Sequence, residues 1–201
     1  MENKKKYEIN DFLAGYAKGK GHNPEDWIKD YVVNKMSSNI TTIIDFGCAN
    51  GRNFIPFPKE KYKYIGFDIH DYDDIIWMNN IEVEYYTCSL EDFFIDYSKY
   101  NLDWENSLIM IHLTLMYLDT ANQQNKFIDL LKSLGCKNFV FHEYGNSKKV
   151  LSDLSEHARN KKLGYLDLNE TNKKMFEPPF GNIFKFRDFN NDMCAFIHLI
   201  K

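Results

Sequence analysis

This sequence has few cysteines, no long apolar run and no excess of positive charge. Its four cysteines, at positions 48, 88, 136 and 194, show no C-x-x-C spacing, which argues against a zinc site and against a disulfide framework. No stretch approaches the roughly 18 apolar residues of a membrane span, and the N-terminal residues are polar. We therefore expect reduced thiols, no bound metal, no membrane association and a cytoplasmic location.

The charge balance limits the class of partner. The chain has 25 Lys and Arg against 29 Asp and Glu, a net charge of −4, and no basic stripe interleaved with aromatic residues. A nucleic-acid partner is therefore not expected. No repeat, low-complexity tract or Pro/Gly/Ser linker divides the 201 residues, so we expect one domain over residues 1–201 with a sizeable core.

Residues 40–53 are the most informative stretch. A β-branched isoleucine run is typical of a strand buried on both faces in a parallel sheet, and we expect it to end at Asp45. The following residues, from Gly47 to Gly51, are small and rich in glycine. They predict a turn whose backbone approaches another group closely, and we take that group to be a ligand. A nicotinamide site of the G-x-G-x-x-G type would need glycines at 47, 49 and 52, and only the first is present.

This pattern of acid, spacer, glycine, three small residues and glycine resembles motif I of the class I S-adenosylmethionine-dependent methyltransferases. The resemblance implies S-adenosylmethionine as cofactor, with S-adenosylhomocysteine as product. The glycine loop would pass beneath the methionine part of the cofactor, and the acid would organise the loop and its bound water or amino group. Alanine stands where the family often has its middle glycine. The implied cofactor contacts in this stretch are Asp45, Gly47, Cys48, Ala49, Gly51 and Asn53.

A second acid follows at a suitable distance. Residues 62–68 are aromatic and β-branched, which predicts a strand ending at Asp68. In dinucleotide sites, an acid about 20 residues beyond the glycine turn accepts hydrogen bonds from a ribose diol. Asp68 lies at a similar distance beyond Gly51. The resemblance implies the same ribose contact for Asp68 and a contact between Ile69 and the adenine.

The adenine amino group has several candidate partners in the sequence. A third strand is predicted over residues 81–88. It leads to Ser89, where family members often have an acid that receives the adenine amino group, and to Leu90, which the resemblance also implies as a cofactor contact. The Ser89 hydroxyl or a backbone carbonyl can accept the same hydrogen bond, or Glu91 or Asp92 could accept it instead. Ser89 is also a suitable helix N-cap, with Asp92 three residues later forming a weak capping box, and the two roles are compatible.

Candidate catalytic groups follow the next two strands. Residues 107–112 predict a fourth strand ending at His112, at the edge where open α/β sheets gather their ligand groups. An imidazole suits proton transfer from an acceptor hydroxyl, although a buried structural histidine is an equal interpretation. A fifth strand, residues 137–145, brings Glu143 and Tyr144 to the same edge on opposite faces, so only one face should reach the cleft.

The remaining segments complete the expected fold. Apolar spacing predicts helices within residues 8–36, at 121–134 and at 146–162, a loop over 163–182, and a terminal hairpin over 183–189 and 193–200. Prolines after the glycine loop restrict the helix there to a turn or two. The resemblance implies a doubly wound α/β fold with a mostly parallel seven-stranded sheet and an antiparallel C-terminal strand. Residues 40–201 would form the Rossmann-like core and residues 1–36 a helical lid, with Tyr16 touching the cofactor.

The predicted function is methyl transfer from S-adenosylmethionine to a small-molecule acceptor at oxygen. His112 would be the base or the acceptor-orienting group, with Glu143 and Tyr144 as second candidates. Alternatives are a non-catalytic or regulatory cofactor-binding protein of the same fold, a protein or RNA acceptor, and, more distantly, a nicotinamide oxidoreductase. The sequence determines neither the acceptor nor the oligomeric state.

Overall fold

A computed structural model describes residues 28, 32–70, 82–112, 114, 115, 118, 121–144, 185–189 and 193–198. Residues 121, 122, 142–144, 185–189 and 193–198 are described by their backbone. Tyr16, most of the predicted N-terminal helices, the predicted helix at 146–162 and the loop at 163–182 lie outside the described residues. Within the described part of the chain, no helix is both long enough and apolar enough to cross a membrane.

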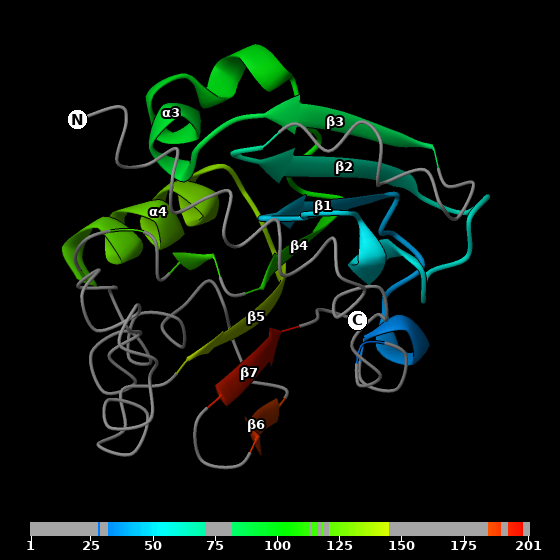
Figure 1. The fold of residues 1–201 in the computed structure, drawn as a ribbon. Coiled ribbons are helices and arrows are strands. Elements are labelled where there is room, and N and C mark those ends of the chain that lie inside the picture. Colours follow the sequence, from blue (N-terminus) through cyan, green and yellow to red (C-terminus); the bar gives the residue numbers. More distant parts are fainter. Residues whose placement is uncertain are drawn as a thin grey trace.

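Five parallel strands form the main part of the sheet (Figure 1). Each of these five predicted strands is present, with its ends shifted by at most two residues, because β-branched and aromatic runs mark them in the sequence. The prediction of a parallel α/β sheet is confirmed. The strands are β1 (Thr42–Phe46), β2 (Lys63–Asp68), β3 (Val83–Thr87), β4 (Ser107–His112) and β5 (Asn138–Tyr144).

The strand order is β3-β2-β1-β4-β5-β7-β6. Strand β7 (Met193–His198) lies between β5 and β6 (Lys185–Phe189) and is antiparallel to both. The chain builds outward from β1 to β3 and then crosses back to place β4 on the other side of β1. Ligands of open α/β sheets bind outside the carboxyl ends of the strands at this kind of reversal. The topology therefore indicates the tips of β1 and β4 as the site.

Two α-helices are described, α3 (Leu90–Ile95) and α4 (Ala121–Ser133), and both lie on the same side of the sheet (Figure 1). The helix predicted at 121–134 is confirmed. The segment after the glycine loop forms only the three-residue 3-10 helix η3 (Arg52–Phe54), as the prolines at 56 and 58 predict. The 3-10 helices η2 (Val33–Lys35) and η5 (Tyr97–Tyr100) are also described.

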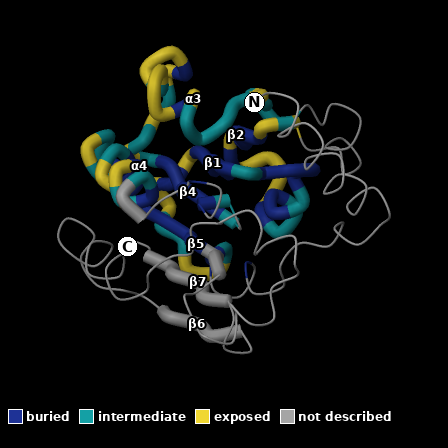
Figure 2. The backbone as a smooth tube through the Cα atoms, turned by 60° about the vertical axis from the view of Figure 1, so that its left-hand side comes forward, coloured by how far each residue is buried: buried dark blue, intermediate teal, exposed yellow. Residues whose placement is uncertain are grey.

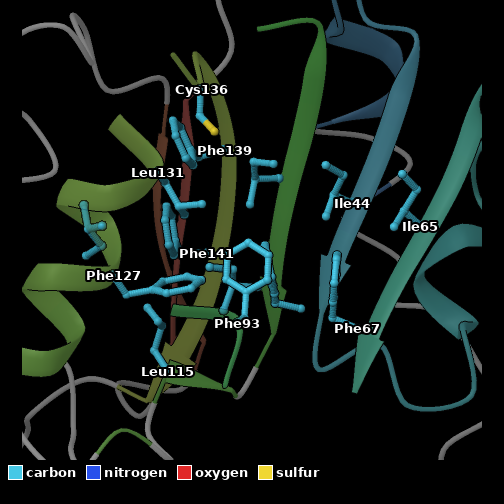
Figure 3. Close-up of a cluster of buried hydrophobic side chains, with 14 of the residues drawn as sticks. Ile44, Ile65, Phe67, Phe93, Leu115, Phe127, Leu131, Cys136, Phe139 and Phe141 are labelled. Atoms are coloured by element: carbon cyan, nitrogen blue, oxygen red, sulfur yellow. The ribbon is translucent and has the colours of Figure 1, made fainter. Parts of the chain in front are cut away.

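The core has one cluster on each face of the sheet. Alternation along β1 directs Ile44 and Phe46 to the cluster beneath α3 and α4, and Ile43 to the opposite cluster with Phe54. Burial on both faces explains the apolar run of β1, which is dark in Figure 2 together with β4, whereas α3 carries exposed residues. We call the cluster beneath α3 and α4 the first cluster and the one on the opposite face the second cluster. Figure 3 shows the first cluster, which includes Ile65, Phe67, Phe93, Leu115, Phe127, Leu131, Cys136, Phe139 and Phe141.

Candidate functional site

The chain turns sharply at the tip of β1. Gly47, Ala49 and Gly51 have φ angles of +74°, +47° and +72°, in the left-handed region that residues other than glycine rarely adopt. The Gly47 N–H donates to the Phe67 carbonyl at 2.7 Å, and the Gly51 N–H donates to the Cys48 carbonyl at 2.8 Å. The turn is therefore closed on itself and anchored to the end of β2.

Only glycine fits at position 47, because Thr114 leaves no room for a side chain there. A Cβ atom at this position would lie 1.8 Å from Thr114 Oγ1, which is an impossible contact. The Thr114 hydroxyl itself donates to the His112 carbonyl at 2.8 Å. The glycine loop and the end of β4 are thus packed together at the sheet reversal. Sequence reasoning did not indicate Thr114, because a lone threonine after a strand has no distinguishing spacing.

Asp68 anchors the loop as well as ending β2. Its Oδ2 atom accepts from the Ala49 N–H at 2.9 Å, and its Oδ1 atom accepts from the His70 N–H at 3.1 Å. Burial raises the pKa of Asp68, and these backbone donors oppose the rise. The hydrogen bond holds Ala49 in a backbone conformation that costs roughly 1–2 kcal/mol for a residue with a side chain. The next residue, Ile69, is an apolar side chain 44% exposed at the strand tip.

Asp45 is fully buried and incompletely hydrogen-bonded. Its Oδ2 atom accepts from Asn53 Nδ2 at 3.4 Å, whereas its Oδ1 atom has no hydrogen-bond partner among the described residues. The Asn53 Oδ1 atom is also buried without one in that part of the chain. Burial raises the pKa of Asp45 from 3.8 to about 8, against the opposing effects of the Asn53 hydrogen bond and the Arg52 charge. Buried acceptors without donors are rare in native proteins, so these two oxygens suit a ligand that donates hydrogen bonds.

His112 ends β4 and meets a cation. Its Nε2 atom lies 3.2 Å from Arg52 Nη2. Arg52 directly follows Gly51, and its backbone N–H donates to Asn50 Oδ1 at 3.3 Å. Sequence reasoning missed Arg52, because no local pattern connects residues that lie 60 positions apart and meet only through the sheet.

Ser89 and Cys48 have clear structural roles. The Ser89 hydroxyl accepts from the Asp92 N–H at 3.0 Å and donates to Asp92 Oδ2 at 2.8 Å, so the predicted N-cap of α3 is confirmed. Leu90 packs against the first core cluster. The Cys48 thiol is buried in the second cluster against Gly66, and burial raises its pKa. A ligand in the loop would therefore meet Cys48 through its backbone.

The structure gathers most of the predicted site at one edge. Asp45, the Gly47–Gly51 loop, Asp68 and His112 lie at the carboxyl ends of β1, β2 and β4. Glu143 and Tyr144 end β5, where their backbones pair with Cys194 and Met193 of β7. Among the described residues, no group of three or more His, Cys, Asp and Glu side chains could hold a metal ion.

Comparison with known proteins identifies the fold. No family model matches the chain, and no curated protein does. Among solved structures, an O-methyltransferase family protein from Burkholderia thailandensis has a TM-score of 0.58 at 14% identity, over 86% of this chain and 55% of that one. Magnesium protoporphyrin IX methyltransferase from Synechocystis PCC 6803, with S-adenosylhomocysteine bound, has a TM-score of 0.57 at 12% identity, over 86% and 81%. The chain has the class I methyltransferase fold.

Proteins with this class I fold act on different acceptors. The small RNA methyltransferase HEN1 also matches, with a TM-score of 0.54 at 13% identity, over 88% of this chain and 25% of that one. This chain spans about half the length of the Burkholderia protein. At such identities the likeness concerns the fold, and the chemistry must be argued from the site.

Proposed function

We propose that this protein is an S-adenosylmethionine-dependent methyltransferase that binds its cofactor across the tips of β1 and β2. The buried Asp45 Oδ1 atom, which has no hydrogen-bond donor within the described residues, is the observation that carries the proposal. The positively charged amino group of the cofactor is the kind of donor that this oxygen needs, because its charge would also favour the ionised form of Asp45. The left-handed turns at Gly47 and Gly51 allow the backbone to approach the ligand closely.

Two residues at the end of β2 are proposed to hold the nucleoside. Asp68 uses its two oxygens for two backbone N–H groups, and a carboxylate has about four lone-pair sites, so it can also accept from ribose hydroxyls. The exposed Ile69 side chain is available to pack on the adenine. Ser89 and Leu90 follow β3 at the same edge, and a contact between them and the adenine amino group belongs to the proposal.

When bound, S-adenosylmethionine supplies a methyl group that its sulfonium already activates. The protein therefore has mainly to hold the acceptor in line with the reacting bond, and such positioning is worth roughly 7–11 kcal/mol. We propose a small-molecule acceptor that is methylated at oxygen, with His112 at the tip of β4 beside it. Glu143 and Tyr144, at the end of the adjacent β5, are second candidates. The net charge of −4 supports a small acceptor over RNA.

The remaining parts of the family architecture are proposed on the same basis. Residues 1–36, including Tyr16, would form a helical lid over residues 40–201. This lid and residues 163–182 would enclose the acceptor, with helices on both faces of the sheet. Limited proteolysis tests the lid: cleavage within residues 1–36 should slow when S-adenosylmethionine is added, and unchanged cleavage would argue against it.

Calorimetry tests the cofactor assignment. The protein should bind S-adenosylmethionine and not NAD, and Asp68→Ala should weaken binding by roughly 1–3 kcal/mol, because ribose hydroxyls lose a charged acceptor. Asp68→Asn is the matched control, since its amide oxygen can still accept one hydrogen bond. Binding of NAD in place of S-adenosylmethionine would overturn the proposal. Binding without transfer of labelled methyl to any component of a metabolite extract would favour the non-catalytic alternative.

A further inference from the structure

The contact between Arg52 and His112 joins the two parts of the proposed active site. Arg52 directly follows the Gly47–Gly51 loop, and His112 is the candidate group for the acceptor. Their side chains meet at 3.2 Å between Nη2 and Nε2, and the contact is partly buried. A guanidinium has five N–H donors and no acceptor, so the shared hydrogen bond requires a lone pair on His112 Nε2.

This requirement determines where the imidazole carries its proton. With Nε2 as the acceptor, a neutral His112 must hold its proton on Nδ1. Nε2 cannot then take a proton from an alcohol acceptor, because its lone pair faces a permanent cation. The charge of Arg52 also acts on Asp45, so a single guanidinium couples the two strand tips.

We propose that Arg52 is a positioning residue that holds His112 as the Nδ1–H tautomer, and that the methyl acceptor is a carboxylate. This inference rests on the proposed methyltransferase function. An Nδ1–H group donates a hydrogen bond and suits an acceptor that is already anionic. A carboxylate has two oxygens, one to receive this hydrogen bond and one to attack.

The chemistry balances without a base. The attacking carboxylate oxygen forms the new O–C bond as the S–C bond of the methyl donor breaks. The electron pair of that bond returns to sulfur, which changes from sulfonium to thioether. The acceptor has no proton to lose, so His112 needs only to orient it. The product would be a methyl ester.

Nitrogen NMR tests the positioning role without any substrate. In ¹⁵N-labelled protein, with the His112 signals assigned from a His112→Asn variant, Nδ1 should resonate as a protonated nitrogen and Nε2 as an unprotonated one. Arg52→Met should remove this preference, whereas Arg52→Lys, which also only donates, should retain it. The backbone bond from residue 52 to Asn50 survives both changes, and the unchanged signals of the other histidines report that the fold is intact. A protonated Nε2 in the unmodified protein, or identical spectra in Arg52→Met, would overturn the role of Arg52.

Product chemistry tests the acceptor class. The protein is incubated with S-adenosylmethionine labelled in its methyl group and with a metabolite extract, and the products are then treated with alkali. Methyl esters release labelled methanol, whereas methyl ethers and N-methyl products keep the label, so released methanol is the expected result. Labelled products that resist alkali would overturn the carboxylate acceptor but not the proposed function. A protein that binds the cofactor and labels nothing would refute both, while the NMR result would stand independently.

Discussion

Gly47 and Gly135 share a left-handed backbone but have different surroundings. A Cβ on Gly47 would lie 1.8 Å from Thr114 Oγ1, whereas a Cβ on Gly135 would meet nothing within 4 Å. Alanine carries a left-handed penalty of roughly 1–2 kcal/mol at either position, and only at Gly47 does it also overlap a neighbour. We expect Gly47→Ala to lower the free energy of unfolding in urea more than Gly135→Ala, and to abolish cofactor binding, which Gly135→Ala leaves intact.

A second substitution isolates the steric cause. Thr114→Ala removes Oγ1 and Cγ2, two of the three atoms that a Cβ on Gly47 would strike. Combined with Gly47→Ala, it should recover part of the lost stability, because the backbone penalty remains but most of the overlap does not. Equal losses in Gly47→Ala and Gly135→Ala would show that Thr114 is not the obstacle.

The raised pKa of Asp45 makes stability depend on pH. In the unfolded chain this carboxyl ionises near pH 3.8, whereas in the folded protein it stays protonated up to about pH 8. Its contribution to stability is therefore complete below pH 3.8 and is lost as the pH rises toward 8, by up to about 1.4 kcal/mol per pH unit. Asp45→Asn cannot ionise, and its amide oxygen can still accept from Asn53.

Urea denaturation between pH 4 and pH 9 measures this effect. The stability of Asp45→Asn relative to the unmodified protein should grow with pH up to about pH 8 and then level off. Asp68, whose pKa burial also raises, titrates in both proteins and largely cancels from the comparison. Parallel stability curves for the two proteins would refute a buried neutral Asp45.

The sequence reveals residues that form a local pattern, but it does not reveal contacts that form only across the sheet. The grouping of Asp45, Gly47 and Asp68 at one edge of the sheet was predictable, because the acid, the glycines and the second acid follow strands at short, fixed spacings. Arg52 and Thr114 were not, because their partners are brought close only when β1 pairs with β4. The loop-anchoring hydrogen bond from Ala49 to Asp68 was missed for the same reason, since it forms only when β1 pairs with β2.

At the scale of elements, α3 depends on its N-cap. Ser89 satisfies the Asp92 N–H, and the helix is only six residues long, so this bond is a large part of its local stability. Ser89→Ala should cost roughly 0.5–2 kcal/mol in urea denaturation, while Ser89→Asn, an equally good cap, should cost little.

Calorimetry on both variants separates the two roles of Ser89. If the Ser89 hydroxyl binds the adenine, Ser89→Asn will weaken cofactor binding without lowering the free energy of unfolding. If it does not, cofactor affinity will change in neither variant beyond what the lost stability explains.

Element types were easier to predict than element neighbours. The β-branched runs of β1 and β4 and the apolar face of α4 define their structures locally, and the prolines after the glycine loop explain why η3 is so short. The register between strands depends on packing across the sheet, which a single sequence does not display. The direct adjacency of β1 and β4 is a property of the strand order, and no local pattern in the sequence encodes it.

At the scale of the whole molecule, the strand pairings span very different sequence distances. Thr42 pairs with Lys63 of β2, the next strand along the chain, and also with Ser107 of β4, which comes only after both β2 and β3. Strand β4 in turn pairs with β5, the strand that follows it in the sequence. Closing the longer β1–β4 loop costs about 1 kcal/mol more chain entropy than closing the β1–β2 loop.

This difference predicts an order of folding. We expect the β1-β2-β3 and β4-β5 units to form first and to join through β1 and β4, because the shorter loops cost less entropy to close. Pulsed hydrogen exchange during refolding should therefore protect β2 amides before those that link β1 to β4. Simultaneous protection of both sets of amides would contradict this order.

The sheet reversal at β1 and β4 also determines when the site is completed during folding. Gly47 meets Thr114, and Arg52 meets His112, only across the seam between the two units. A chain that has folded each unit separately holds Asp45 and Asp68 but lacks the contacts that close the site. Completion of the site would thus be the last event of folding, and tight cofactor binding would report a fully assembled sheet.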